Sequence, residues 1–463
     1  MATNQLNRSL GLKLVVVVVI GNIIGSGVYK KVAPMTDALH SPGWVLICWV
    51  LGGIISLFGA LCNAEVAGLL ADTGGEYVYY KKIYNKFFSF MFGWSLFAVI
   101  QTGAIAALAF VCAESLNHIL HLPPVLTSLS DIHLGDKFYP FADLNVKLTA
   151  IILIILLTWI NRRGVKTGAG VSTAVLLLVF ASLLLIVGFG LTSGHANIQG
   201  AFSLRTSDAS TVSFSAVFTA MLAAFWAYQG WASVGFVGGE IKNANKNIPR
   251  GIVIGILSII AIYLLVNFTY LALLPVENIE AVFKAGNQIT AVEAVRSFWG
   301  DSGALFISIL ISVTTLGCTN ATILTSSRIY YAMAKEGVFF SRVSKLNNRQ
   351  VPSSSLLFQC VWACLLVLSG TFDQITDMII FAVFIYYGAT TLGVFILRKK
   401  MPDAPRPYKV WGYPIVPAIV ILFCAVLFIN TIFARPLEAA VGMGLMLTGV
   451  PLWFWFNRKS GSQ

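Results

Sequence analysis

Charged residues are scarce in this chain. Asp, Glu, Lys and Arg make up 11% of its 463 residues, whereas they make up about 25% of an average soluble protein. Hydrophobic residues make up 57%, and the mean hydropathy is +0.81. Because so few polar residues cannot cover a folded core, the chain needs lipid around it. The composition excludes a set of soluble domains and predicts one polytopic, all-α membrane domain over residues 1–463.

The chain also lacks the residue clusters on which metal and redox chemistry depend. None of its seven cysteines has CxxC spacing, and its five histidines lie outside the apolar runs. An enzyme embedded in a membrane would need a metal cluster or a buried nucleophile beside a base, and the sequence has neither in a suitable place. We therefore expect no metal, no cofactor, no catalytic residues and no enzymatic activity.

The net charge of +12 is a feature that nucleic-acid-binding proteins share. Here, however, the basic residues lie in short loops between apolar runs, which is typical of cytosolic loops in membrane proteins. We therefore interpret the charge as a sign of orientation in the membrane and expect no nucleic-acid partner.

Twelve apolar segments are candidates to cross a bilayer, which takes about 20 residues. They cover residues 12–36, 44–70, 87–116, 147–160, 171–191, 212–239, 249–275, 302–334, 354–370, 374–397, 413–433 and 438–457. An even number of spans places both termini on one side. If that side is cytosolic, only eight of the 31 Lys and Arg residues lie on the other side: Lys30, Lys31, Lys137, Lys147, Arg205, Lys284, Arg296 and Arg435. The asymmetry predicts cytosolic termini, with Lys30 and Lys31 as the clearest local exception.

Two of these segments are interrupted by glycine and polar residues. The first contains three glycines within 21–27, and the sixth reads FWAYQGW over 225–231. Each glycine costs a helix about 1 kcal/mol relative to alanine, although small residues also permit close helix packing. Because the two segments are five spans apart, they cross the membrane in opposite directions. Paired breaks of this kind indicate an inverted-repeat transporter, with repeats over 12–191 and 212–397 and two added helices over 413–457.

The breaks also suggest a binding chemistry. The amides of Ser26 and Gly27 would begin a half-helix, whose positive dipole end suits a carboxylate. The preceding half-helix would end near Ile23 and Ile24, and its free carbonyls suit a cation. At the second break, the free carbonyls near Trp226 and Ala227 would likewise suit a cation. A carboxylate site beside an ammonium site describes an α-amino acid bound as a zwitterion.

At this point the chain resembles a known family along nearly its whole length. The runs FWAYQGW at 225–231, EIKNANKNIPR at 240–250 and PRPYKVWGYP at 405–414 are the strongest matches, with GNIIGSGVY at 21–29 in support. They resemble the amino acid–polyamine–organocation superfamily, nearest its L-type amino acid transporter branch. The resemblance implies the LeuT-like fold, in which helices one and six are broken and five helices are repeated in inverted orientation.

The resemblance also implies a set of site residues. Ser26 and Gly27 match carboxylate-binding positions, and Trp226 matches an aromatic lid that gates the substrate or, alternatively, packs in the core. Tyr228 is a candidate to shape the side-chain pocket. Gln101 stands where the L-type branch often has arginine, and faces the cavity or hydrogen-bonds within the bundle. The full substrate set is Ile23, Ile24, Gly25, Ser26, Gly27, Gln101, Phe225, Trp226, Ala227 and Tyr228.

Departures from the family pattern bear on substrate and partners. Residues 174–180 contain no lysine to stand in for a bound cation, and Ala232 replaces an acid found in arginine exchangers. Residues 117–146 contain no cysteine, so we expect no disulfide-linked heavy-chain subunit. We expect the protein to lie in a bacterial cytoplasmic membrane. We further hypothesise that Glu240 pairs with basic residues such as Arg250 to close the cytosolic gate.

These features predict a transporter that exchanges neutral L-amino acids by alternating access, with the amino acid and the lipid bilayer as its partners. The alternative is a proton- or sodium-coupled symporter. Ser312, Thr314 and Thr315 are possible oxygen ligands for a hard cation, although helix hydroxyls also bond to their own backbone.

Overall fold

The computed structural model describes residues 11–70, 75–129, 132, 140–164, 169–207, 211–231, 241–406 and 408–460. Within these ranges the chain forms helices and no strand. The helices are α1 (Leu12–Ile23), α2 (Gly27–Lys30), α3 (Val32–Leu39), α4 (Pro42–Leu69), α5 (Gly75–Ile83), α6 (Lys86–Ser95), the π-helix η1 (Leu96–Ile100), α7 (Gln101–Leu120), the 3-10 helix η2 (Thr127–Leu129), α8 (Leu144–Arg162), α9 (Ala169–Thr192), α10 (Ile198–Ala201), α11 (Phe214–Tyr228), α12 (Ala244–Leu273), α13 (Val276–Ala285), α14 (Thr290–Lys335), the 3-10 helix η4 (Ser341–Ser344), α15 (Ser353–Ser369), α16 (Phe372–Lys400), α17 (Ile415–Ala434), α18 (Pro436–Leu447) and α19 (Gly449–Ser460).

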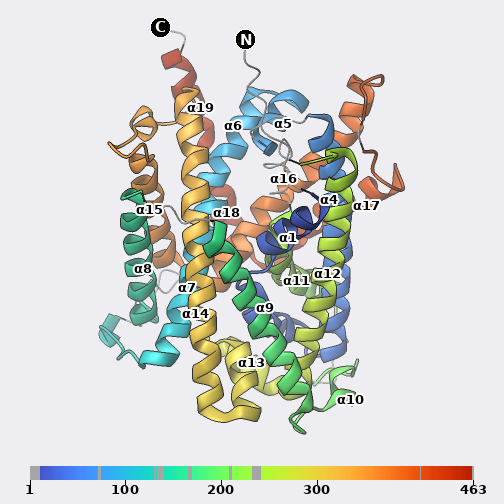
Figure 1. The fold of residues 1–463 in the computed structure, drawn as a ribbon, viewed down its shortest axis with the longest axis vertical. Coiled ribbons are helices and arrows are strands. Elements are labelled where there is room, and N and C mark those ends of the chain that lie inside the picture. The colour runs from blue at the N-terminus through green and yellow to red at the C-terminus, as the bar shows by residue number, and fades with distance from the viewer. Residues whose placement is uncertain are drawn as a thin grey trace.

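The described residues contain the expected membrane spans. Nine helical stretches are long and apolar enough to cross a bilayer, and the shorter apolar helices α1, α11 and α15 add three. Together they correspond one to one with the twelve predicted segments. Figure 1 shows both chain ends at one end of the molecule, with α5 nearby and α10 and α13 at the other end. We call these the terminal end and the opposite end. The protein is an all-α, multi-pass membrane protein.

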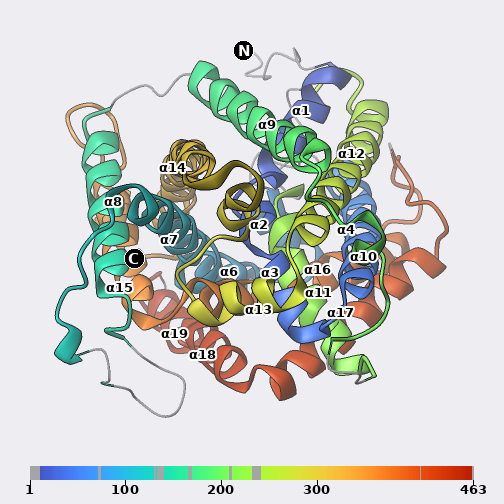
Figure 2. The same ribbon diagram turned by 90° about the horizontal axis from the view of Figure 1, so that it is seen from below.

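The spans differ in how deeply they are buried. In Figure 2, α2 lies near the middle of the bundle, with α8, α9, α12 and α18 around it. The span over Lys86–Leu120 has 89% of its apolar window buried inside the protein, whereas the span over Ile415–Ala434 has 28%. The first is therefore a central helix, and the second turns most of its surface toward lipid.

Both predicted breaks occur, and they touch each other. α1 ends at Ile23, and α2 begins at Gly27 after an extended residue and Ser26. α11 ends at Tyr228, slightly later than expected, and is followed by Gly230 with φ of +123°. A side chain at Gly230 would collide with the Asn22 carbonyl, so only glycine fits there.

The remainder of the second broken span lies outside the described residues, and Glu240 and Ala232 lie there as well. The division into two repeats stays a prediction. The longer loops at the opposite end contain short helices, namely η2 and α13. α14 also begins there and bends at Gly300, whose φ is +66°.

Candidate substrate site

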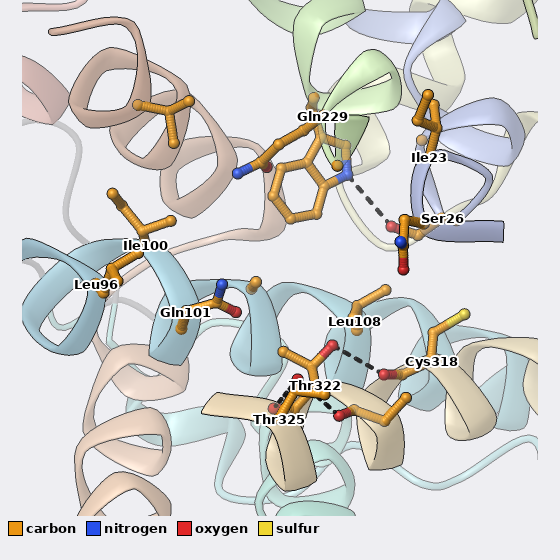
Figure 3. Close-up of a pocket in the computed structure, with 18 of the residues that line it drawn as sticks. Ile23, Ser26, Leu96, Ile100, Gln101, Leu108, Gln229, Cys318, Thr322 and Thr325 are labelled. Atoms are coloured by element: carbon orange, nitrogen blue, oxygen red, sulfur yellow. Dashed lines mark hydrogen bonds between the residues drawn. The ribbon is translucent and has the colours of Figure 1, made fainter. Parts of the chain in front are cut away.

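A cavity of about 320 Å³ lies at the two helix breaks. Residues 21–27 of the first break and Trp226, Gln229 and Gly230 of the second form one side of it. The other walls come from α7, α14 and α16, and Glu76 of α5 also lines it. Figure 3 shows Gln101, Thr322 and Thr325 across the cavity from Ser26 and Gln229.

Most of the residues expected at the site line this cavity: Ile23, Ile24, Gly25, Ser26, Gly27, Gln101 and Trp226. Phe225, Ala227 and Tyr228 do not. The Phe225 ring packs against Phe384 and Phe423. The Tyr228 hydroxyl donates to the carbonyl of Trp49 at 2.9 Å. The structure thus places the Tyr228 ring among buried aromatic residues outside the cavity, where it does not shape a side-chain pocket.

The first break supplies the donors expected for a carboxylate. Ser26 immediately precedes α2, and its Oγ accepts a hydrogen bond from Nε1 of Trp226 at 3.3 Å, shown as a dashed line in Figure 3. Within the described chain, the backbone amides of Gly25 and Ser26 have no backbone acceptor. The amides that begin α2 also lack a partner within the helix. Together these backbone N–H groups form a cluster of hydrogen-bond donors beside the cavity.

The carbonyl ends of the two half-helices meet at a tyrosine. The hydroxyl of Tyr263, on α12, lies 3.2 Å from the Ile23 oxygen and 3.0 Å from the Ala227 oxygen. Each carbonyl oxygen can accept a second hydrogen bond, so both remain possible ammonium acceptors. No sequence signal identified Tyr263, because a tyrosine within an apolar span is usually an ordinary packing residue.

Gln101 follows the π-helix η1, which widens the centre of the long central span. Thr102 closes this irregular turn, since its Oγ1 donates to the Phe97 carbonyl at 2.5 Å. Short π-helical turns of this kind frequently occur at functional sites. The Gln101 side chain is half-buried and points into the cavity. Of its two predicted placements, the structure shows the one that faces the cavity.

Two buried ion pairs lie on the opposite-end side of the cavity. Lys30 Nζ lies 2.6 Å from Glu114 Oε1, and Lys31 Nζ lies 2.6 Å from Asp373 Oδ1. Lys31 also donates to Thr376 at 2.6 Å. We call Lys30, Lys31, Glu114 and Asp373 the lysine latch. The latch joins α2 and α3 to α7 and α16, and its lysines are buried rather than exposed in an outer loop, which explains their exception to the charge asymmetry.

An aromatic residue completes the closure on this side. The Phe372 ring centre lies 5.0 Å from Lys30 Nζ and 4.7 Å from Lys31 Nζ. The Trp226 ring meets Phe372 edge-on at 6.2 Å. Phe372 therefore links the lid tryptophan to the latch lysines, while the cavity lining continues toward the terminal end through Thr325, Ile329 and Glu76. The cavity lining therefore extends toward the terminal end, whereas the latch and Phe372 lie on its opposite-end side.

The hydroxyls considered as cation ligands, those of Ser312, Thr314 and Thr315 on α14, give little indication of a cation site. The hydroxyls of Thr314 and Thr315 donate to the carbonyl of Ile311 at 3.0 and 2.7 Å. The Ser312 hydroxyl is buried without a hydrogen-bond partner. Among the described residues, no three His, Cys, Asp or Glu side chains come together as metal ligands.

A multi-pass membrane protein with a solute-sized cavity at two touching helix breaks has the architecture of a secondary transporter. Residues 10–456 match the family model described as amino acid permease. The chain belongs to the amino acid permease family.

Curated relatives that align with nearly the whole of this chain support the assignment. The serine/threonine exchanger SteT of Bacillus subtilis is 30% identical, over 99% of both chains. The large neutral amino acids transporter small subunit 2 of Mus musculus is 30% identical, over 97% of this chain and 81% of its own. The mouse b(0,+)-type amino acid transporter 1 is 26% identical, over 98% and 89%.

These comparisons confirm the resemblance to the amino acid–polyamine–organocation superfamily and its L-type branch. The relatives are transporters, and the function of this chain is amino acid transport, with a small-molecule substrate.

Proposed function

We propose that this protein exchanges neutral L-amino acids across a bacterial cytoplasmic membrane, with both termini in the cytosol. The observation that carries the proposal is the cavity at the two touching breaks. The first break offers it both free amides and backbone carbonyls, and no charged side chain of α1, α2 or α11 lines it in the described structure. This arrangement suits the two opposite charges of an amino acid zwitterion.

In the proposed complex, the substrate carboxylate accepts hydrogen bonds from the amides of residues 25–27 and from the Ser26 hydroxyl. The ammonium group donates to the carbonyls of Ile23 and Ile24. The corresponding backbone positions expected on α11, Phe225 and Ala227, do not line the cavity. Trp226 covers the bound amino acid, since its ring lies between Ser26 and Phe372. The substrate side chain points toward α7 and α14.

The cavity wall supports a neutral side chain. No lysine or arginine lines the cavity in the part of the chain that the structure describes, so a second carboxylate would find no ionic partner there. The amides of Gln101 and Gln229 and the hydroxyls of Thr322 and Thr325 face the cavity. They suit a small polar or modest apolar side chain, in line with a serine/threonine exchanger among the relatives.

Alternating access follows from the closed lysine latch. Under this proposal the terminal end is cytosolic, and the latch lies on the outer side of the cavity. Opening to the outside would separate α2 and α3 from α7 and α16, and the cytosolic side would then close. The proposed closing pair, Glu240 with Arg250, and the inverted repeats over 12–191 and 212–397 belong to this mechanism.

Exchange is favoured over ion coupling because the span-eight hydroxyls that sodium would need are mostly bonded to their own helix. We also propose that the protein is a transporter without catalytic activity. It functions without a disulfide-linked subunit, because the 117–146 loop has no cysteine.

The test is uptake into liposomes that contain the purified protein. Labelled L-serine, L-threonine, L-alanine and L-leucine are supplied without any ion gradient, to vesicles that are empty or loaded with the same unlabelled amino acid. Exchange predicts uptake only into loaded vesicles. Uptake that requires a proton or sodium gradient instead would establish the symporter, and no uptake of any of the four would refute a neutral substrate.

A further inference from the structure

A carboxyl group without a partner lines the cavity on its terminal-end side. Glu76, the second residue of α5, is 8% exposed. Its buried Oε1 has no hydrogen-bond partner among the described residues, although the side chain faces the cavity. Burial raises the pKa of Glu76 from 4.5 to about 7. A buried carboxylate of this kind is stable only when a proton or another cation compensates it.

The surroundings of Glu76 suit a cation. Phe92, Tyr386 and Tyr387 line the same cavity, and Glu76 interacts electrostatically with Tyr387. The Tyr387 ring packs on Trp231 with ring centres 4.4 Å apart, so this aromatic wall reaches the second break. Aromatic faces attract ammonium groups, which adds to the attraction of the carboxylate.

The basic residues on the elements packed against α5 are directed elsewhere. Glu65 of α4 is bonded to Arg398 at 2.7 Å. Lys400 of α16 donates to the Ile83 carbonyl at 2.9 Å. Lys86 of α6 is exposed, as are Lys81 and Lys82 on α5 itself. In the described structure none of these cations lines the cavity, so any compensating charge other than a proton has to arrive with a ligand.

We infer that Glu76 and the neighbouring aromatic residues form a second binding position, which takes the ammonium group of an amino acid between the helix breaks and the terminal end. This inference rests on the proposed transport of amino acids. The position is separate from the carbonyls of the breaks, because Glu76 belongs to α5, outside both broken helices. It gives a released substrate an ionic contact on its way out and an incoming substrate one on its way in. It also repels a substrate with an extra carboxylate.

Ethanolamine is the sharpest probe, because it carries the ammonium group and lacks the carboxylate. The thermal unfolding midpoint of the purified full-length protein in detergent is measured against ethanolamine concentration at pH 8. We expect ethanolamine to raise the midpoint of the wild type. In Glu76→Gln, the half-saturating concentration should increase at least about tenfold, as expected for a lost charge-assisted hydrogen bond. Glu76→Asp, which retains the charge, should fall between the two.

Asp403→Asn is the matched control, since it removes an exposed acid at the same end of the molecule, and it should behave as the wild type. Equal half-saturation in the wild type and Glu76→Gln would overturn the inference, and so would an absence of any ethanolamine effect on the wild type.

A second measurement separates ammonium binding from proton transport. Exchange of labelled L-threonine is followed in liposomes that contain a pH-sensitive dye. We expect no proton movement with either protein and a higher KM in Glu76→Gln. Proton uptake by the wild type that disappears in Glu76→Gln would overturn the inference in favour of a proton carrier. If the wild type fails to exchange any neutral amino acid but still binds ethanolamine through Glu76, then the proposed function fails and the site stands.

Discussion

Breaking one ion pair of the lysine latch should shift the transporter toward the state that is open at the opposite end. The perturbation is Asp373→Asn, compared with Lys31→Met and with the double variant. The Lys31 side chain is 0% exposed and the Asp373 side chain is 20% exposed. Asp373→Asn therefore leaves a fully buried ammonium group without its counterion, whereas Lys31→Met leaves a carboxylate that water can reach.

The magnitude follows from this difference in burial. Removing one partner of a buried ion pair costs about 3–5 kcal/mol, because an uncompensated charge remains. The cost applies to the closed latch, since in the open state water hydrates the remaining charge. At about 1.4 kcal/mol per factor of ten, 3 kcal/mol shifts the two-state ratio by roughly 150-fold. We expect the full effect for Asp373→Asn, a smaller one for Lys31→Met, and less than their sum for the double variant.

Hydrogen–deuterium exchange measured by mass spectrometry reports the shift. Peptides that cover α2, α3 and the first turns of α16 should exchange faster in Asp373→Asn than in the wild type. Lys284→Met is the control, because the Lys284 side chain lies at the same end and is 68% exposed, 3.7 Å from Glu280, so its ion pair contributes little. The reasoning is refuted if Asp373→Asn behaves like this control, or if the effects of the two single variants simply add.

Three further predictions concern the breaks and the cavity. Gly27→Ala should abolish exchange in liposomes, because the new Cβ would lie 2.6 Å from the backbone Cα of Ala227. Gly188→Ala is the control, since a Cβ at Gly188 has nothing within 4 Å, and this variant should exchange normally. Trp226→Phe retains an aromatic lid but loses the indole N–H that donates to Ser26. The KM of exchange should therefore rise about fivefold, as for the loss of a neutral hydrogen bond of about 1 kcal/mol. An unchanged KM would contradict a role of this hydrogen bond in substrate binding. Burial raises the pKa of Glu76 from 4.5 to about 7, so the folded state holds this proton more tightly than the unfolded state, and stability falls as pH rises through that window. Glu76→Gln should therefore unfold at the same temperature as the wild type at pH 4.5. At pH 8 it should unfold at a higher temperature, with a free energy of unfolding larger by up to about 3 kcal/mol. A difference between the two proteins that does not depend on pH would count against this prediction.

The sequence predicted the spans and the breaks because both depend on local properties. Apolar length locates a span, and glycine clusters locate a break, so α1 and α11 end within a few residues of the expected positions. Errors occur where a helix continues past its apolar part. α12, for example, begins at Ala244 and contains Pro249, whereas a start at residue 249 was expected from hydropathy.

The orientation of individual side chains could not be predicted in the same way. Tyr228 and Trp226 are two residues apart in one helix, yet only Trp226 lines the cavity. The lysine latch was also missed, because the charge count treated Lys30 and Lys31 only as exceptions on the outer side, and nothing local indicates their partners, which lie 84 and 342 residues away. Such pairs depend on tertiary packing, which no periodicity in a single sequence reveals.

The placement of charge gives a physical reason for exchange rather than one-way transport. Closing the terminal end over an empty cavity would remove the remaining water from the Glu76 carboxyl while no cation is present, and an uncompensated buried charge is costly. An amino acid in the cavity brings an ammonium group and offsets that cost. Under the proposed mechanism the loaded carrier can therefore change state, whereas Glu76 and the lysine latch hold the empty carrier in the state that opens toward the terminal end. A carrier that returns only when loaded is an exchanger, so the same two charge clusters that shape the pathway also account for the proposed mode of transport.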